Sequence, residues 1–180
     1  MTEYIFELKI PKERIAVLIG KKGEMKKQVE ELTNAKLEID SNEGDVFIKC
    51  DDTIKMYTAR EIVKAIGRGF NPECAFLLLK PDYCFEIVNL NDYIKSKSQI
   101  NRLKGRVIGS EGKARKTIEA LTETYICVYG KTVGIIGETE NVSMARRAIE
   151  SLLGGSPHSN VYKWLEKNRS MMKRKKIIGS

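Results

Sequence analysis

One short phrase occurs twice in this chain of 180 residues. Ile19-Gly20-Lys21-Lys22-Gly23 recurs as Ile108-Gly109-Ser110-Glu111-Gly112, and the offset from Gly20 to Gly109 is 89 residues. The apolar residues that follow repeat at the same offset: Val29, Leu32, Leu37 and Ile39 correspond to Ile118, Leu121, Ile126 and Val128. A fixed internal offset indicates a duplicated structural unit. The duplication therefore predicts two similar domains in tandem.

Composition and charge narrow the class of protein. The chain is 42% hydrophobic and 31% charged, which is typical of a folded globular protein. Its length accommodates two compact units of roughly 70–80 residues. The net charge is +8, from 32 Lys and Arg against 24 Asp and Glu. An excess of this sign favours a nucleic acid or another anionic surface as the partner.

Metal, membrane and export signals are missing from the sequence. The one histidine and the four cysteines form no Cys-x-x-Cys pair or other zinc pattern; they are His158, Cys50, Cys74, Cys84 and Cys127. No apolar run approaches the roughly 20 residues that a membrane helix needs. The alternating Met1–Ile10 segment lacks the apolar centre of a signal peptide. We therefore expect a cytoplasmic protein with reduced thiols, no metal, no cofactor and no membrane partner.

Hydrophobic periodicity predicts the order β-α-α-β-β-α in both copies. In the first copy the expected elements are a strand at Tyr4–Ile10, helices at Lys12–Ile19 and Glu24–Thr33 around the loop Gly20–Gly23, strands at Lys36–Asp40 and Asp45–Cys50, and a helix at Thr53–Ile66. In the second copy they are a strand at Cys84–Leu90, helices at Lys97–Ile108 and Lys113–Thr124 around the loop Gly109–Gly112, strands at Tyr125–Tyr129 and Thr132–Ile136, and a helix at Glu138–Leu153.

Two segments lie outside the repeats. Asn71-Pro72 is typical of a helix cap with a first-turn proline, and the apolar run Ala75–Leu79 follows it. We expect a short helix here that fixes the two repeats against each other. The last stretch, Val161–Lys176, should dock on the second unit through Trp164 and end as a solvated basic tail. The predicted divisions are residues 1–69, 70–82, 83–155 and 156–180.

The paired glycines point to phosphate binding. They allow a tight turn and remove side chains that would keep a phosphate away, and each loop leads into the electropositive N-terminus of a helix. In the first copy Lys21, Lys22, Lys26 and Lys27 add positive charge, whereas the second copy carries Ser110 and Glu111 with Lys113, Arg115 and Arg106 nearby. We expect the first loop to supply more of the nonspecific electrostatic attraction. Bases should lie in grooves floored by Ile19 and Ile39, and by Ile108 and Val128.

This arrangement resembles the type I K-homology (KH) domain, a single-stranded RNA-binding module whose loop clamps the backbone of about four nucleotides. The resemblance implies an α+β fold of two KH domains packed together, each a three-stranded antiparallel sheet backed by three helices, followed by a C-terminal helix and basic tail.

A closer resemblance is to the partner-of-Nob and Krr-type assembly factors of the small ribosomal subunit, in their archaeal form. It rests on Arg106–Gly109, Lys113–Thr124, Met144–Arg146, Leu153-Gly154, Ser156–Tyr162 and the linker Gly69–Glu73. The resemblance implies binding to the 3′ region of small-subunit rRNA during ribosome biogenesis, beside a PIN-domain endonuclease that processes the precursor. Glu111 departs from the uncharged or basic residue common at its loop position.

The sequence thus predicts a monomeric RNA-binding protein of pre-rRNA processing without catalytic activity, because it offers no Ser-His-Asp, Cys-His or metal-ligand set. One alternative is an interaction scaffold in which one KH face, the second, binds the processing endonuclease or a translation initiation factor. A nuclease is a third alternative. We expect Gly20→Asp combined with Gly109→Asp to abolish RNA binding while the fold survives.

Overall fold

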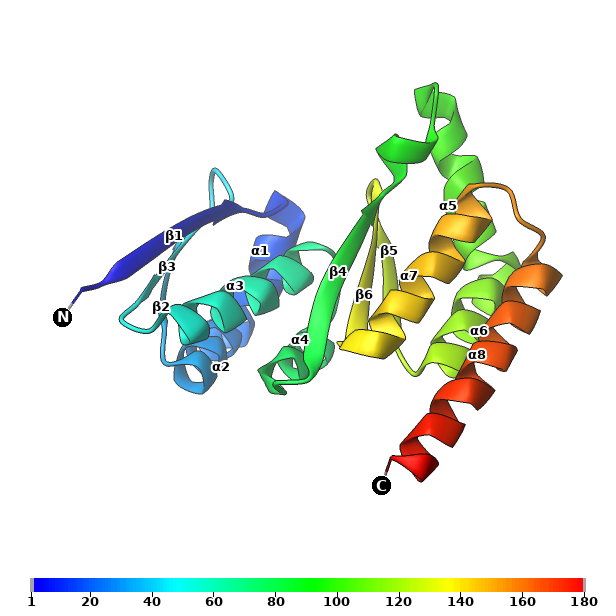
Figure 1. Ribbon diagram of the computed structural model, residues 1–180. Coiled ribbons are helices and arrows are strands. Elements are labelled where there is room, and N and C mark those ends of the chain that lie inside the picture. The colour runs from blue at the N-terminus through cyan, green and yellow to red at the C-terminus, as the bar shows by residue number, and fades with distance from the viewer. Residues whose placement is uncertain (1, 180) are drawn as a thin grey trace. The chain divides into compact units, whose positions relative to one another are not determined.

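The computed structural model describes residues 2–179. The chain divides into two compact units, one up to Phe85 and one from Glu86 onward. The order β-α-α-β-β-α is confirmed in both repeats (Figure 1). No helix among the described residues is long and apolar enough to cross a membrane.

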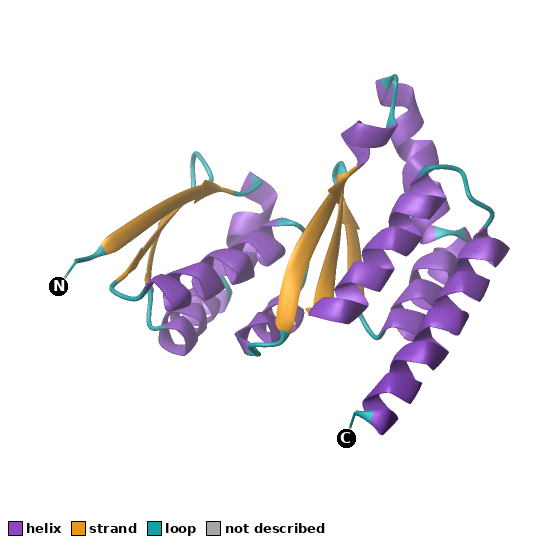
Figure 2. Ribbon diagram, in the orientation of Figure 1, coloured by secondary structure: helices purple, strands orange, loops and turns teal. Residues whose placement is uncertain are grey.

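The first unit is a three-stranded antiparallel sheet with helices on one face (Figure 2). Its elements are β1 (Tyr4–Lys9), α1 (Lys12–Ile19), α2 (Glu24–Thr33), β2 (Lys36–Asp40), β3 (Asp45–Cys50) and α3 (Thr53–Gly67), and the strand order is β1-β3-β2. Ile48 of β3 pairs with Phe6 on one side and Leu37 on the other. Because side chains alternate along a strand, these three point to the helix-covered face, where Ile48 and Leu37 are fully buried.

The predicted short helix between the repeats is also present. It consists of α4 (Pro72–Ala75) and a 3₁₀ turn at Phe76–Leu79. The side-chain oxygen of Asn71 accepts a hydrogen bond from the Cys74 amide at 2.8 Å, with Pro72 in the first turn as expected. Ala75 and Leu78 are buried. That this segment fixes the repeats against each other stays a prediction.

The second unit repeats the architecture and ends in a longer helix. Its elements are β4 (Tyr83–Asn89), α5 (Ile100–Ile108), α6 (Lys113–Thr122), β5 (Tyr125–Tyr129), β6 (Thr132–Glu138), α7 (Thr139–Leu153) and α8 (His158–Ile178), with strand order β4-β6-β5. Two predicted helix boundaries in the repeats were wrong by two or more residues. Lys97–Gln99 is a 3₁₀ turn before α5, and α6 ends at Thr122 because Glu123 takes the left-handed conformation that terminates the helix, with φ 54°.

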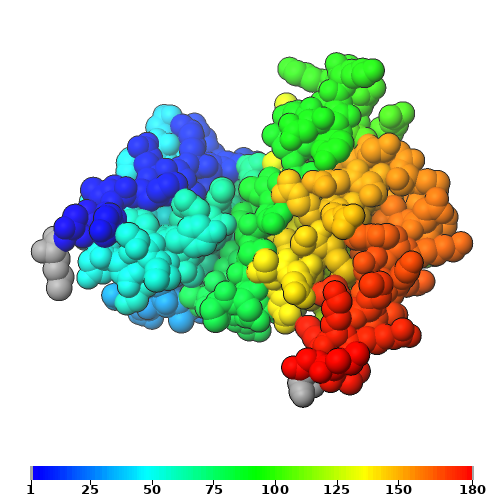
Figure 3. Space-filling view, in the orientation of Figure 1, coloured from blue at the N-terminus to red at the C-terminus, as the bar shows by residue number. Residues whose placement is uncertain are grey.

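The C-terminal stretch is one continuous helix. Val161 and Leu165 are its buried residues, and α8 packs along α6 and α7. Trp164 is only half-buried and lies under the Arg147 guanidinium, 5.0 Å from the ring centre. The helix therefore docks through Val161 and Leu165, which corrects the expectation that Trp164 is the anchor. The predicted basic tail is the exposed end of this helix, seen at the red C-terminus in Figure 3.

Candidate nucleic-acid interface

The first glycine loop joins α1 to α2 through a single 3₁₀ turn, Lys21–Gly23. Gly20 has φ 73° and ψ 178°, and its amide donates to the Ala16 carbonyl at 2.9 Å, which ends α1. Lys22 follows with φ 53° and ψ 26°, and Gly23 with φ 77° and ψ 11°. A lysine in the left-handed region is uncommon and costs about 1 kcal/mol or more. The loop backbone is therefore held in one particular shape.

The second loop has the same shape despite its different sequence. Gly109 has φ 74° and ψ 176°, Glu111 has φ 54° and ψ 29°, and Gly112 has φ 74° and ψ 13°. The Gly109 amide donates to the Gly105 carbonyl at 2.8 Å, as its counterpart does in the first unit. A lysine at one loop position and a glutamate at the other adopt the same strained conformation. The backbone geometry is thus common to both units, whereas the loop charge is not.

The two glycines of each loop serve different purposes. A Cβ added at Gly20 would lie 2.5 Å from the Cβ of Met25, and one at Gly109 would lie 2.7 Å from the Cβ of Ala114. The first glycine therefore permits the close approach of the second helix. At Gly23 a Cβ would meet nothing within 4 Å, so this glycine supplies only its left-handed conformation.

This geometry contradicts the expectation that Gly20→Asp with Gly109→Asp leaves the fold intact. An aspartate at either position would combine a forbidden backbone conformation with a clash against the following helix. Loss of RNA binding by that double variant would report loss of structure as well. The exposed positions between the glycines are the better sites for substitution.

A glutamate fixes the neighbouring strand in each unit. Oε1 of Glu30 accepts a hydrogen bond from the Leu37 amide at 2.7 Å, and Oε1 of Glu119 accepts one from the Ile126 amide at 2.7 Å. Each bond joins the helix after the loop to the first residues of the adjacent strand. Both glutamates were missed by the sequence interpretation, although they occupy equivalent positions in the repeat.

The residues predicted to floor the grooves are partly accessible. Ile19 and Ile39 in the first unit, and Ile108 and Val128 in the second, are half-buried, whereas their neighbours Leu37 and Ile126 are buried. Half-buried apolar side chains can still contact a planar base. Their contact with bases stays a prediction.

The predicted polar contacts differ in how freely they face solvent. Lys21, Lys22 and Lys27 are exposed, and so are Ser110, Glu111 and Lys113; Lys26 and Arg115 are half-buried. These side chains lie on the loops and on the first turns of α2 and α6, as expected. The exposed side chains are accessible to an anion near each loop, whereas the Nε of Arg115 is buried.

Arg106 has a structural contact that the sequence interpretation did not anticipate. Its Nε donates to the Leu152 carbonyl at 2.8 Å and an Nη to the Ser156 carbonyl at 2.6 Å. His158 Nε2 lies 2.8 Å from the carbonyl oxygen of Arg106 itself. The guanidinium thus closes the end of α7. A contact between Arg106 and RNA stays a prediction.

The net positive charge lies in the second unit. Residues from Glu86 onward include 18 Lys and Arg against nine Asp and Glu, a net charge of +9. The preceding residues include 14 Lys and Arg against 15 Asp and Glu, a net charge of −1. The first loop is rich in lysine, but the unit that carries it is nearly neutral. A long-range attraction for anions therefore comes from the second unit.

The described residues contain no cluster of three or more His, Cys, Asp or Glu side chains suited to a metal ion. The four cysteines are free thiols. The groups present at the two loops are backbone amides, lysines and arginines, the Ser110 hydroxyl, the Glu111 carboxylate and half-buried aliphatic side chains.

Family models match both units. Residues 84–170 match the model for the second KH domain of PNO1, described as a eukaryotic-type KH domain (type I), and residues 5–67 match the general KH-domain model. KH domain-containing protein MJ0443 of Methanocaldococcus jannaschii is 51% identical over 171 residues, which are 93% of this chain and 75% of that protein. RNA-binding protein PNO1 of Oryzias latipes is 35% identical over 113 residues, 62% of this chain and 46% of the relative. The chain thus spans less than half the length of that eukaryotic relative.

Solved structures agree with the sequence relatives. The crystal structure of Dim2p from Pyrococcus horikoshii OT3 is 47% identical, with a TM-score of 0.86 over 91% of this chain and 99% of the other. A chain of the a/eIF2alpha–aDim2p–rRNA complex from the same organism is 46% identical, with a TM-score of 0.88 over 93% of this chain and 95% of the other.

Proposed function

This chain belongs to the PNO1/Dim2 family of KH-domain proteins, and on that premise we propose that it binds single-stranded RNA through its two glycine loops and acts in pre-rRNA processing. The observation that carries the proposal is the match between the loops: two sequences that differ in charge hold the same backbone, and each exposes the two residues between its glycines at the start of the following helix. Such a loop at a helix N-terminus suits a phosphate. Adjacent half-buried aliphatic side chains suit the bases that follow.

We further propose that the RNA is the 3′ region of small-subunit rRNA. The support is the family resemblance together with the related Pyrococcus structure, whose components are a/eIF2alpha, aDim2p and rRNA. The units that bind it would be KH domains at residues 1–69 and 83–155. In this proposal the chain is a monomer and a binding protein rather than an enzyme, and it works beside a PIN-domain endonuclease.

The decisive test replaces the exposed residues between the glycines and leaves the glycines in place. Lys21→Asp with Lys22→Asp, combined with Ser110→Asp and Glu111→Asp, puts carboxylates where a phosphate would lie. Aspartate tolerates the left-handed conformation that Lys22 and Glu111 adopt. We expect at least about a tenfold loss of affinity for single-stranded RNA, measured by fluorescence anisotropy, since like charges would face the backbone.

A matched control keeps the charge change of the first loop but moves it away. Lys55→Glu with Lys64→Glu places the same reversal on exposed positions of α3. This control should retain wild-type affinity. Unchanged RNA affinity in the loop variant would overturn the proposal. A scrambled RNA compared with one copied from the 3′ region tests the finer assignment.

A second candidate function is supported by the initiation factor in the related complex. In this alternative one KH face binds a protein such as the α subunit of initiation factor 2. Loop variants that keep RNA affinity but lose that protein would favour it. For the nuclease alternative, labelled RNA incubated with the chain and Mg²⁺ should remain intact. Cleavage that an acidic-residue substitution abolishes would contradict a binding-only role.

A further inference from the structure

The end of α8 carries far more positive charge than its docking requires. Between His158 and Ile178 this helix has seven Lys and Arg and one acidic residue, Glu166. Its attachment to the second unit depends on buried apolar residues, chiefly Val161 and Leu165. The basic residues contribute little to that attachment, and most of them are exposed.

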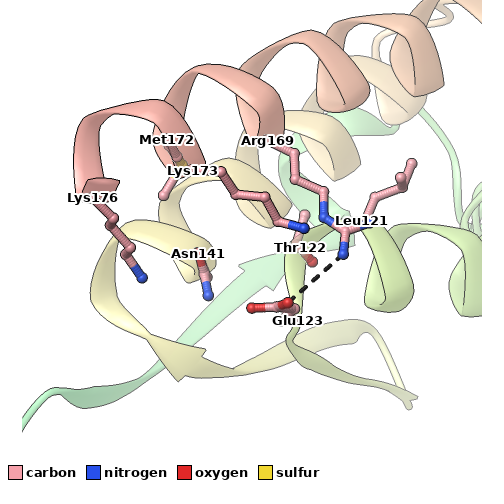
Figure 4. Close-up of a pocket in the computed structure, with 8 residues that line it drawn as sticks. All are labelled: Leu121, Thr122, Glu123, Asn141, Arg169, Met172, Lys173 and Lys176. Atoms are coloured by element: carbon pink, nitrogen blue, oxygen red, sulfur yellow. Dashed lines mark ion pairs between the residues drawn. The ribbon is translucent and has the colours of Figure 1, made fainter. Parts of the chain in front are cut away.

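Three of the basic residues share one face of the helix. Arg169, Lys173 and Lys176 follow the i, i+4, i+7 spacing that aligns side chains along a helix. They line one hollow together with Leu121 and Glu123 at the end of α6 (Figure 4). The close-up shows the Arg169 side chain reaching from α8 toward Glu123, whereas the Lys176 side chain lies on the side of Asn141.

This face is continuous with the second glycine loop. Leu121 also lines the hollow beside that loop, which Lys113 and Lys116 border together with Ser110 and the exposed Glu111. The ten residues of α6 span about 15 Å between the two places. Lys113, Lys116, Arg169, Lys173 and Lys176 thus form one row of positive charge, the α6–α8 basic track.

The nearby carboxylates neutralise the track only in part. Arg169 lies 3.7 Å from Glu123, and Lys176 lies 3.6 Å from Glu138; in each pair both side chains keep a third or more of their surface exposed. Pairs of this kind are weak and are easily exchanged for another anion. Lys113, Lys116 and Lys173 have no carboxylate within 4.0 Å among residues 2–179.

The first unit has no equivalent of the track. Glu24 stands at the position of Lys113, and Leu32, the counterpart of Leu121, is 49% exposed. The unit as a whole is nearly neutral. The track therefore belongs to the second unit alone and is not a general consequence of the repeated fold.

We propose that the α6–α8 basic track binds the phosphate backbone of RNA that continues beyond the nucleotides held at the second loop. The inference rests on the proposed function, because the track begins where the backbone would leave the loop. Lysines in a row without aromatic neighbours suit phosphates rather than base edges. The track would increase the affinity for RNA in a way that depends on RNA length and salt concentration. It would not add a preference for any RNA sequence.

The test compares two charge-matched variants on two RNAs. Lys173→Glu with Lys176→Glu removes charge from the track, and Lys167→Glu with Arg174→Glu makes the same reversal on the opposite face of α8. One RNA has about four nucleotides, enough for one groove, and the other has about twenty. The track variant should bind the long RNA at least about tenfold more weakly and the short RNA with unchanged affinity, since each contacted phosphate contributes to affinity. The control should change either affinity much less.

Salt dependence gives an independent readout. The log of the affinity for the long RNA decreases as the log of the salt concentration rises. In Lys173→Gln with Lys176→Gln this slope should become less steep by about 1.4, or 0.7 for each lost phosphate contact. Circular dichroism melting checks that α8 remains docked in every variant. The proposal would be overturned if both charge-matched variants lost the same affinity for the long RNA. It would also be overturned if the track variant lost as much affinity for the short RNA as for the long one.

The proposed function and the track fail in different ways. If wild-type protein does not bind the long RNA, the RNA-binding proposal itself is wrong. If the wild type binds and the track variant binds equally well, only the track is wrong. A track variant that keeps RNA affinity but loses an acidic peptide such as poly-glutamate would assign the surface to a protein instead.

Discussion

Arg14 and Arg106 bind equivalent pairs of carbonyls in the two units from positions one helical turn apart. Nε of Arg14 donates to the Ile66 carbonyl and an Nη to that of Phe70, both at 2.8 Å. Arg106 makes the same two bonds to Leu152 and Ser156, the residues 86 positions further along. Arg14 lies six residues before its glycine loop, whereas Arg106 lies three before its own. In both units an arginine guanidinium thus binds the carbonyl groups at the end of the last KH helix, but the two arginines come from different positions in the repeat.

Replacing Arg106 with alanine should destabilise the protein. Two carbonyls at the end of α7 would lose charged donors, and hydrogen bonds to charged groups contribute about 1.5–3 kcal/mol each when no water replaces them. Because the site is half-buried and water can reach part of it, we expect a loss of about 1–3 kcal/mol in the free energy of unfolding, measured with urea. Arg14→Ala should behave alike.

Arg102→Ala on the exposed surface of α5 is the control, with an expected change within about 0.5 kcal/mol. An Arg106→Ala protein as stable as this control would show that the two carbonyl contacts contribute nothing. A loss of RNA affinity without loss of stability would instead support the predicted RNA contact of Arg106.

The two glycines of the second loop should differ in their tolerance of alanine. At Gly109 a methyl group would meet the Ala114 backbone nitrogen at 2.7 Å in a conformation that essentially only glycine adopts, so we expect a loss of about 3 kcal/mol or more. At Gly112 a methyl group would meet only the Cε of Lys116, at an ordinary contact distance of 3.8 Å, so the cost of alanine is that of the left-handed conformation, about 1–2 kcal/mol. Thermal melting should show the larger shift for Gly109→Ala. Equal shifts would contradict the close-approach argument.

Leu165→Ala should weaken the docking of α8 more than Trp164→Ala does. Leu165 is fully buried, and a leucine-to-alanine change in a core costs about 2–5 kcal/mol. Trp164 is half-buried beside Arg147. Its replacement should lower the free energy of unfolding by about 1–2 kcal/mol, through the loss of buried apolar area and of the cation–π contact. Urea unfolding of the two variants compares the two residues directly. A more damaging Trp164→Ala would restore the sequence-based view of Trp164 as the anchor.

The internal repeat made the fold predictable from the sequence. The end of α6 and the contacts of Arg106 and Glu119 were not predictable in the same way. Hydrophobic spacing predicted every helix and strand of both repeats, because the apolar residues of each element recur on the one face that packs into the core. Leu37 and Ile48 are examples, and both are fully buried. The end of α6 depends on whether Glu123 accepts a left-handed conformation, which periodicity does not encode. The roles of Arg106 and Glu119 depend on which backbone groups come close in three dimensions. Contacts of that kind follow from the tertiary structure and not from spacing.

The docking of α8 illustrates a related limit. The sequence predicts Trp164 as the anchor, but the helix face that meets α6 and α7 is set by Val161 and Leu165, four residues apart. The location of the net positive charge in the second unit follows from the sequence when each unit is considered by itself. The lysines at 21 and 22 predict a stronger attraction at the first loop, but the first unit as a whole has a net charge of −1.

The pairing of Glu38 with Lys49 across β2 and β3 should make the stability of the fold depend slightly on pH. The ammonium of Lys49 lies 2.7 Å from Oε1 of Glu38. This hydrogen bond, and then the charge of Lys49, lower the pKa of the Glu38 carboxyl from its ordinary value; the same bond raises the pKa of Lys49. A lowered folded-state pKa stabilises the fold above the unfolded value, near 4.3, and the contribution is lost as pH falls through the folded value. For Lys49 the contribution is present below the unfolded pKa, near 10.4, and is lost as pH rises through the raised one.

An NMR titration of the Glu38 side chain tests this pairing, because the pair is exposed and its effect on overall stability is too small to carry the test. Lys49→Met should return the pKa of Glu38 toward its ordinary value, since both leading causes of the shift are removed. Lys55→Met, at an exposed position on α3, should leave it unchanged. Raising the salt concentration should narrow the difference between wild type and Lys49→Met, because solvent ions screen an exposed pair. A Glu38 pKa that stays low in Lys49→Met would mean that the other lysines near β2, Lys36 and Lys26, hold the carboxylate instead.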